Sequence, residues 1–294
     1  MDVSAARLFC QGPGSRRVGE LRIVLGKGGA GRTTVAAALC LSAARKGRAA
    51  TLVTLSPLAP GTGVAGDETL DPIPFRTLAI DPRAELDAAV ARVTGLRLLP
   101  RLLSFHPAYA ALADVAPGVK EVASLDRIVA LSRQTDLVVV DAPATGHGRN
   151  LLLAPRKAAD LVAGRLRERA LAVESALREP TCRATVVATP EEMPVREARE
   201  LLELLDANGF HAERPVLNRC LPAVTQDEEE GDRLAALANA AGPAEPWAKA
   251  ARWIDRAHRE GEVAAADLPS PRRVPWIPSP AGRLARVADA MEAP

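Results

Sequence analysis

Residues 21–34 constrain the fold more than any other part of the sequence. The stretch LRIVLGKGGAGRTT passes from an apolar run, Leu21–Leu25, through a glycine-rich turn into a helical pattern that begins at Thr33. Glycine adopts backbone angles that are closed to other residues, and it lets amide N–H groups approach an anion closely. The N-terminus of the next helix adds unpaired donors and the positive end of its dipole. The stretch therefore predicts a strand–loop–helix unit that binds phosphate.

The spacing matches the phosphate-binding pattern G-x-x-x-x-G-K-[ST], except that Arg32 stands where a lysine is usual. We expect this loop to bind the β-phosphate of a nucleotide, and we expect the hydroxyl of Thr33 to contact Mg²⁺. The residues predicted to bind the nucleotide are Gly26, Gly28, Gly29, Ala30, Gly31, Arg32, Thr33 and Thr34.

Short apolar runs alternate with longer amphipathic segments, which is typical of a parallel sheet with crossover helices. The expected strands are Leu21–Leu25, Ala50–Leu55, Arg76–Ile80, Leu137–Val140, Ala184–Ala188, Pro215–Leu217 and Arg273–Ile277. The expected helices are Thr33–Arg45, Val119–Arg133, Ala159–Arg178, Pro194–Asn208, Gln226–Ala241, Ala248–Arg259 and Pro280–Met291. We predict one α/β domain over residues 1–294, a doubly wound and mostly parallel sheet with helices on both faces. A small helical excursion is expected at about 93–118 and 154–180, and a helical C-terminal part at 221–272.

Composition excludes several classes of function. The 294 residues carry a formal net charge of +2, so no strong overall field acts on partners. Aromatic residues make up 3%, which argues against base-stacking platforms for nucleic acids. The four cysteines are far apart, which argues against a zinc site or a redox pair. Without a long apolar run we expect no integral membrane segment, and we expect a cytoplasmic protein that binds no nucleic acid.

Lys27 directly follows the first glycine of the loop. In this respect the loop resembles the deviant phosphate loop GKGG-x-GKTT of the SIMIBI class of nucleotide hydrolases. The resemblance implies that Lys27 reaches across a dimer interface to the nucleotide of the partner, in the manner of an arginine finger. The chain has five lysines and 33 arginines, so a lysine at this position argues against an accidental surface residue.

A second motif narrows the resemblance. Residues 137–150, LVVVDAPATGHGRN, are similar to the switch II signature D-T-A-P-T-G-H of the arsenite-pump ATPase and the tail-anchored-protein targeting ATPase. Weaker matches at 78–82, 116–121 and 216–218 follow in family order. The resemblance implies binding of ATP or ADP with Mg²⁺, held by Thr33 and, through water, by Asp141. It also implies that Thr145, Gly146 and His147 sense the γ-phosphate and that Asn218 contacts adenine.

Two departures from the family pattern concern catalysis. Arg32 keeps a positive charge, but a planar guanidinium cannot occupy the slot of an ammonium without some rearrangement. Ser56 stands where the switch I aspartate of the family positions the attacking water, and a hydroxyl is a poor proton acceptor. With Lys27, Ser56 and Asp141 as the catalytic positions, we predict slow or impaired ATP hydrolysis and retained nucleotide binding.

Three hypotheses about the function stay open. The first is a dimeric, nucleotide-dependent switch, as a homodimer or as a heterodimer with a paralogous ATPase, with a protein client as a possible partner. The second is a pseudo-ATPase scaffold subunit that pairs with an active paralogue. The third is a small-molecule kinase or a dethiobiotin-synthetase-like ligase. The apolar patch Leu96–Phe105 suits packing or a partner surface, Trp247 and Trp253 suit burial or binding, and Trp276 could pack beside the base.

Overall fold

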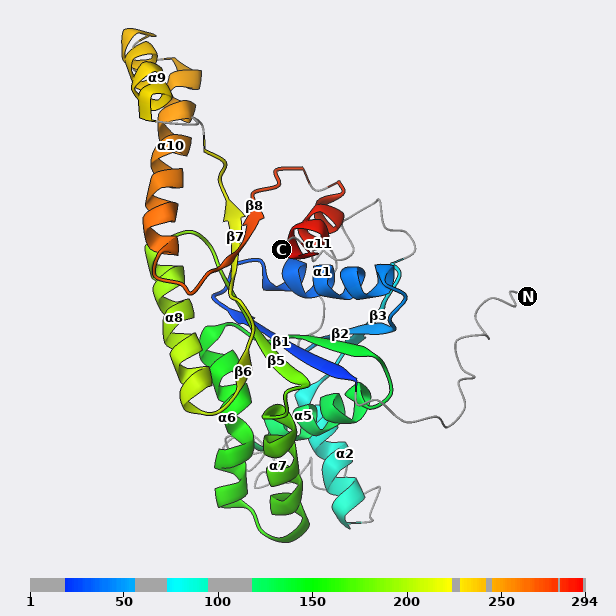
Figure 1. Ribbon diagram of the computed structural model, residues 1–294. Coiled ribbons are helices and arrows are strands. Elements are labelled where there is room, and N and C mark those ends of the chain that lie inside the picture. The colour runs from blue at the N-terminus through cyan, green and yellow to red at the C-terminus, as the bar shows by residue number, and fades with distance from the viewer. Residues whose placement is uncertain are drawn as a thin grey trace, which may run out of the picture.

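A parallel β-sheet forms the centre of the protein (Figure 1). The computed structural model describes residues 19–55, 73–94, 118–223, 228–241, 245–279 and 281–292. The strands of the sheet run in the order β3-β2-β4-β1-β5-β7-β8, and the short strand β6 pairs with β5. The strands are β1 (Glu20–Gly26), β2 (Ala50–Thr54), β3 (Arg76–Ala79), β4 (Leu137–Asp141), β5 (Cys182–Ala188), β6 (His211–Ala212), β7 (Val216–Cys220) and β8 (Arg272–Pro275). Every pairing is parallel.

Helices cover both faces of this sheet, as the sequence predicts for a doubly wound fold. Helices α1 (Arg32–Arg45) and α11 (Arg283–Glu292) pack together on one face (Figure 1). The opposite face carries α5 (Val119–Ser132), α6 (Thr145–Leu161), α7 (Gly164–Leu177) and α8 (Glu192–Ala207). Helix α2 (Pro82–Thr94) packs on α5, and α9 (Glu228–Ala241) and α10 (Pro246–Ala265) form an arm beyond the β7 side of the sheet (Figure 1).

Alternating apolar residues divide the core into two layers. In β1, Ile23 and Leu25 belong to the cluster under α5–α8, whereas Val24 belongs to the cluster under α1 and α11. In β4, Val138 and Val139 divide in the same way. Because successive side chains of a strand point to opposite faces, a sheet covered on both sides needs apolar residues at every position. This requirement explains the continuous apolar runs in the sequence.

All seven predicted strands and most predicted helices are confirmed, with shifts of a few residues at their ends. The prediction of a single helix at 159–178 is wrong. The backbone is extended at Val162, and this break separates α6 from α7. The structure also continues α6 back through Pro155 to Thr145. Leu151 and Leu152 of that segment are buried against the sheet, and this packing outweighs the helix-breaking tendency of proline.

Helix α2 and strand β6 are not among the elements predicted from the sequence. β6 is two residues long and pairs with Arg183 and Ala184 of β5, so it gives little periodic signal. The predicted excursion at 93–118 and the patch Leu96–Phe105 lie almost wholly outside the described residues. Among the residues that are described, no helix is long and apolar enough to cross a membrane.

The parallel arrangement places the candidate site. All carboxyl ends of parallel strands lie at one edge of a sheet, and ligands of such folds bind in the crevice beyond that edge. The glycine-rich loop follows β1, Asp141 ends β4, and Asn218 lies near the end of β7. The fold therefore brings together residues that are up to about two hundred positions apart in the chain.

Candidate functional site

The glycine-rich turn links β1 to α1 at the centre of the sheet. Gly26, Gly29 and Gly31 have φ values of 148°, 85° and 90°. A Cβ atom at Gly26 would lie 2.1 Å from the carbonyl oxygen of Val187, and one at Gly31 would lie 2.2 Å from Nδ2 of Asn218. Conformation and space therefore both require glycine at these two positions.

Helix α1 begins without a side-chain cap, with Gly31 as its N-cap residue. The N–H of Val35 donates to the carbonyl oxygen of Gly31 at 3.0 Å, which starts the helical hydrogen-bond series. The N–H groups of a first helical turn have no partner within the helix, and here they belong to Arg32, Thr33 and Thr34. An anion at this position would gain these donors together with the helix dipole.

Asp141 at the end of β4 faces this helix start. The Thr33 hydroxyl donates to Oδ2 of Asp141 at 2.5 Å, and Oδ1 of the same carboxylate is buried with no hydrogen-bond partner. Burial raises the pKa of Asp141 above its ordinary value, whereas the bond from Thr33 and the charge of Arg32 lower it. The site thus holds a desolvated carboxylate beside a hydroxyl.

This pair of oxygen ligands fits Mg²⁺. Mg²⁺ prefers oxygen ligands and is usually held by one or two protein groups together with substrate phosphates and water. Thr33 supplies a hydroxyl, and the orphaned Oδ1 of Asp141 supplies a carboxylate oxygen that lacks a donor. Among the described residues, no group of three or more His, Cys, Asp or Glu side chains could form a complete metal site. A cation bound here would therefore depend on further ligands from a nucleotide and water.

Arg32, at the position of the usual lysine, bonds to the protein itself. Its Nη1 atom donates to the carbonyl oxygen of Ala142, the residue that follows Asp141. Burial lowers the pKa of Arg32, and the charge of Asp141 opposes this effect. The guanidinium therefore connects the start of α1 to the end of β4.

Lys27 also has a partner within the chain. Its Nζ atom lies 2.8 Å from Oε1 of Glu197 on α8, and the Lys27 side chain is 40% exposed. The resemblance of the loop predicts that this lysine points toward a second copy of the chain. In the single chain it is engaged by α8, so a role in a dimer requires this ion pair to open.

The predicted switch II residues lie at the start of a helix. Thr145, Gly146 and His147 form the first turn of α6, and the N–H of His147 donates to the carbonyl oxygen of Ala144 at 2.8 Å. The His147 side chain is exposed and borders a cavity of about 450 Å³ between α2, α5 and α6. Helical hydrogen bonds therefore begin directly after Ala144.

Ser56, the predicted replacement for the switch I aspartate, lies outside the described residues. The preceding strand β2 pairs with β4, and its last residue, Thr54, lies opposite Asp141. Leu55, which follows Thr54, is buried. The chain therefore leaves the sheet next to the carboxylate of Asp141.

Asn218 joins the loop to β7. Its side chain is 6% exposed, and its Nδ2 atom donates to the carbonyl oxygen of Ala30 at 2.7 Å. The loop thus uses one amide donor of the residue expected to contact adenine. The carbonyl oxygen of the Asn218 side chain has no hydrogen-bond partner among the described residues.

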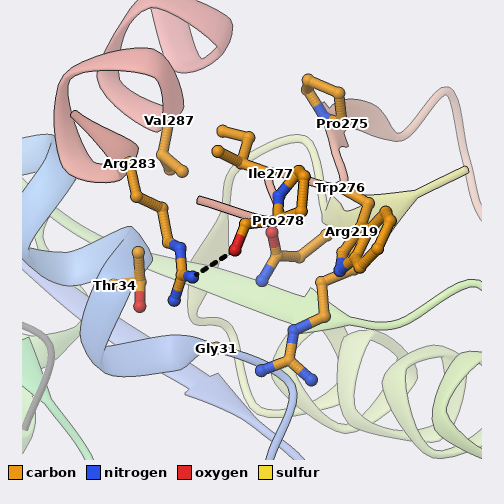
Figure 2. A pocket seen from close by; sticks show the side chains of 10 residues that line it. Gly31, Thr34, Arg219, Pro275, Trp276, Ile277, Pro278, Arg283 and Val287 are labelled. Atoms are coloured by element: carbon orange, nitrogen blue, oxygen red, sulfur yellow. Dashed lines mark hydrogen bonds between the residues drawn. The ribbon is translucent and has the colours of Figure 1, made fainter. Parts of the chain in front are cut away.

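A cavity of about 170 Å³ opens next to Asn218 (Figure 2). Its lining includes Gly31 and Thr34 at the start of α1, Trp276 after β8 and Arg283 of α11. Trp276, which the sequence predicts beside the base, borders this cavity. Sequence reasoning missed Arg219 and Arg283 at this cavity, since no motif distinguishes them among 33 arginines.

We call the two parts of this site the loop end and the β7–β8 end. The loop end consists of residues 26–34 with Asp141 and Ala142. The β7–β8 end consists of Asn218, Arg219, Trp276 and Arg283 around the cavity.

Comparison with known proteins links the site to a family. The model of the family described as anion-transporting ATPase matches residues 20–169, which is about half of the chain. This stretch contains the loop end of the site and ends within α7. The β7–β8 end lies beyond the matched residues.

Individual relatives come from mycobacteria. The ATPase BagA of Mycobacterium tuberculosis is 27% identical over 233 residues, which cover 71% of this chain and 68% of that protein. A protein of Mycobacterium bovis that is also named as an ATPase, Mb3704, matches with the same identity and coverage. Both names describe those proteins as ATPases.

Proposed function

This chain belongs to the anion-transporting ATPase family, and from that premise we propose that it is an ATP-binding switch protein that works as a dimer and hydrolyses ATP slowly. The observation that supports this proposal most directly is the contact of Thr33 with Asp141 beside a loop in which glycine is required. A buried carboxylate with an orphaned oxygen, set against the start of an uncapped helix, suits a phosphate group with its Mg²⁺.

Different groups of the site bind the phosphates, the Mg²⁺ ion and the base of ATP in this proposal. Main-chain N–H groups of the loop and of the first turn of α1 donate to the phosphate oxygens. Thr33 and Asp141 would hold Mg²⁺, which when bound neutralises phosphate charge and acts as a Lewis acid. The adenine base lies toward Asn218 at the carboxyl end of β7.

Lys27 supplies the link between nucleotide and dimer in this proposal. An ammonium group that reaches the nucleotide of a second copy stabilises charge on the transferred phosphoryl group, as arginine fingers do. Lys27 must first leave Glu197, which costs one partly exposed ion pair. Dimer formation would thus depend on an ATP-bound partner that offers Lys27 a more negative site than one carboxylate.

Slow hydrolysis follows from two positions. Arg32 is occupied by the Ala142 carbonyl, so its charge must be redirected before it can contact a γ-phosphate. Ser56 can orient a water molecule but accepts its proton poorly at neutral pH. General-base catalysis typically contributes about 10²–10⁴-fold, so most of that factor is expected to be missing.

The test combines binding with a single-turnover assay on the whole chain. Isothermal titration with ATP and Mg²⁺ should show saturable binding, while excess enzyme should hydrolyse ATP slowly. The double variant Arg32→Lys, Ser56→Asp should raise the single-turnover rate by at least about tenfold, because it restores an ammonium and a carboxylate. Absence of nucleotide binding would overturn the proposal, and an unchanged rate in the double variant would overturn its explanation of slow turnover.

The same two positions favour a second candidate, a pseudo-ATPase scaffold that binds ATP and pairs with an active paralogue. Such a subunit keeps the main-chain donors and Lys27 but needs no turnover of its own. Light scattering on the isolated chain with ATP separates the two functions. A homodimer with measurable turnover favours the switch, whereas an ATP-bound monomer without turnover favours the scaffold.

A further inference from the structure

The hydrogen bond between Arg32 and Ala142 links the phosphate loop to the segment that leads into α6. Nη1 of Arg32 donates to the carbonyl oxygen of Ala142, which directly follows Asp141. We propose that this bond holds the start of α6 in place in the nucleotide-free protein, and that a phosphate group of ATP takes the guanidinium and releases α6. This inference rests on the proposed function, because it assigns to Arg32 the step by which nucleotide binding reaches the switch II residues.

Ala142 is held by hydrogen bonds at both its N–H and its carbonyl group. The N–H donates to the carbonyl oxygen of Val24 on β1 at 3.2 Å. Ala142 is 2% exposed, and Arg32 is the donor that the described structure gives to its carbonyl oxygen. A buried carbonyl that loses its donor is costly, so it must either keep Arg32 or move to a new partner. The position of Ala142 therefore depends on where the guanidinium of Arg32 is bound.

Two residues, Pro143 and Ala144, join Ala142 to α6. The proline ring fixes the φ angle of Pro143, which makes this short linker stiff. The N–H groups of His147 and Gly148 donate to the carbonyl oxygen of Ala144 at 2.8 Å and 3.1 Å, and no side chain caps the helix. The first hydrogen bonds of α6 therefore depend on a linker that moves with Ala142.

The start of α6 is packed closely against this linker and against β1. A Cβ atom at Gly148 would lie 2.9 Å from the carbonyl oxygen of Pro143 and 3.0 Å from Cδ2 of Leu25. Leu25 directly precedes Gly26, the first glycine of the phosphate loop. Close-packed structure shifts between discrete arrangements and does not deform continuously. A displacement of the linker is therefore expected to move the whole first turn of α6, including His147.

ATP competes for the two described side-chain contacts between α1 and the end of β4. Arg32 is the first residue of α1, next to the main-chain N–H groups that would bind a phosphate. A guanidinium bonds more strongly to a phosphate, where both partners are charged, than to a neutral carbonyl. The second contact joins Thr33 to Asp141, and these two residues are the proposed Mg²⁺ ligands. Binding of ATP with Mg²⁺ is therefore expected to replace both contacts.

Hydrogen–deuterium exchange on the full chain measures the release of α6. In the wild type, ATP with Mg²⁺ should raise the exchange rate of the amides at residues 145–151 by about threefold or more, because this turn opens more easily. Inorganic tripolyphosphate with Mg²⁺, which carries the phosphates without the base, should have the same effect. Exchange in β1 at the centre of the sheet should stay unchanged and serves as the internal reference.

Arg32→Met removes the donor and keeps an unbranched side chain that suits a helix. Without nucleotide, the first turn of α6 should already exchange as fast as in the ATP-bound wild type, and ATP should add no further increase. Arg45→Met is the matched control, because Arg45 ends the same helix and donates to Asp289 of α11 at 2.6 Å. It removes the same charge and one side-chain hydrogen bond from α1, and it should leave the exchange of α6 and its response to ATP unchanged.

The outcomes separate this inference from the proposed function. If the wild type binds ATP and the exchange of α6 stays the same or slows, the release is wrong, and this measurement needs no variant to fold. If Arg45→Met speeds exchange as much as Arg32→Met does, or if Arg32→Met keeps the response to ATP, the signal does not pass through Arg32.

Calorimetry on the wild type supplies the remaining outcome. If it shows no binding of ATP or of tripolyphosphate, the proposed function is wrong, and the release by phosphate is wrong with it. The comparison of Arg32→Met with Arg45→Met without nucleotide then still decides whether Arg32 holds the start of α6.

Discussion

The two ends of the site differ in how their charged groups are satisfied. At the loop end, Lys27 pairs with Glu197, Arg32 donates to Ala142, and Thr33 donates to Asp141. At the β7–β8 end, Nε of Arg283 has no partner, and Arg219 has none within the described parts of the chain. Apart from Oδ1 of Asp141, which is buried without a partner, the loop end thus holds its polar side chains through internal contacts, whereas the β7–β8 end presents two guanidinium groups to a cavity.

This difference assigns different thermodynamic roles to the two ends. At the side chains of the loop end a phosphate must replace existing protein contacts, so each of these exchanges yields a small net gain. A base at the β7–β8 end would form bonds that nothing replaces, and it would satisfy a buried donor. We therefore expect the main-chain donors and the base to supply most of the affinity, and the charged side chains of the loop to govern the response to binding.

The largest effect is expected at Gly31. In Gly31→Ala a Cβ atom would lie 2.2 Å from Nδ2 of Asn218, at a φ of 90°. The contact of Asn218 with Ala30 should break and the loop should shift, so ATP affinity should fall by about a hundredfold or more. Titration calorimetry with ATP and with tripolyphosphate measures this loss, which should affect both compounds because the loop end itself is damaged.

Gly47→Ala is the matched control for that variant. Gly47 also has positive φ, 72°, but a Cβ atom there meets nothing within 4 Å. Backbone strain is thus similar in the two variants, and the steric contact is present only in Gly31→Ala. Equal losses of nucleotide affinity in both variants would mean that strain, and not the junction with Asn218, accounts for the effect.

Arg32→Lys tests whether the internal hydrogen bond of Arg32 at the loop end limits the affinity for ATP. A lysine gives up the planar fork that binds the Ala142 carbonyl and offers a compact ammonium to phosphate. We expect an affinity for ATP about three- to tenfold higher and a slightly lower thermal midpoint. Calorimetry and a melting curve on the same samples measure both.

Arg48→Lys controls for the loss of a guanidinium–carbonyl bond, since Nη2 of Arg48 donates to the Asp136 carbonyl away from the site at 3.1 Å. It should leave ATP affinity unchanged. A weaker affinity in Arg32→Lys would show that Arg32 contacts the phosphates despite its bond to Ala142, and the contrast between the two ends would then disappear.

The sequence predicts the parts of this protein that depend on local pattern. Continuous apolar runs predict the strands because both faces of the sheet are covered. The loop glycines, Thr33 and Asp141 carry motifs, and the structure brings these residues together. Family membership, inferred from the same motifs, is confirmed by the match over residues 20–169.

Other features depend on tertiary contacts and leave no mark on the sequence. Glu197 lies 170 positions from Lys27, so their pairing requires the packing of α8 beside the loop. The strained backbone of Arg219 arises from the shift in register between two strands. The first turns of α6 contain Gly146, Gly148 and, later, Pro155, which predict a loop until burial against the sheet is known.

Glu197→Gln tests whether the loop end restrains Lys27. Removal of the carboxylate releases an ammonium that is already 40% exposed, and pairs of this kind contribute about 0.2–1 kcal/mol. If Lys27 acts on a second copy, the ATP-dependent dimer should form about two- to fivefold more readily. Analytical ultracentrifugation with ATP at several protein concentrations measures the dimer constant.

Glu200→Gln is the control for the Glu197 variant. Glu200 forms an exposed pair with Arg196 at 3.3 Å on the same helix, so its loss changes the charge of α8 by the same amount. It should leave the dimer constant unchanged. If dimer formation increases equally in both variants, the cause is the overall charge of α8. If it increases in neither, the ion pair with Glu197 does not restrain Lys27.

The smallest effect concerns the support of the β7–β8 end. Helix α11 carries Arg283 and is held on α1 partly by Glu292, which accepts from Ser42 and pairs with Lys46 at 3.3 Å. The bond from Ser42, then the contact with Lys46, lowers the pKa of Glu292. A carboxylate with a lowered pKa in the folded state stabilises above its ordinary pKa, and this contribution is lost as the pH falls through the folded value. As the pH falls below the ordinary pKa of glutamate, the attachment of α11 should therefore weaken.

Melting curves of the wild type and Glu292→Gln across this pH range test the attachment. The wild type should melt about 1–2 °C higher at pH 7, and the gap should close as the pH falls below the lowered pKa of Glu292. A gap that stays constant with pH would mean that Glu292 acts through its shape and hydrogen bonding and not through its charge. The helix that carries Arg283 would then be held in place without a contribution from the charge of Glu292. Ion pairs would in that case matter at the loop end and not at the β7–β8 end, which would sharpen the contrast between them.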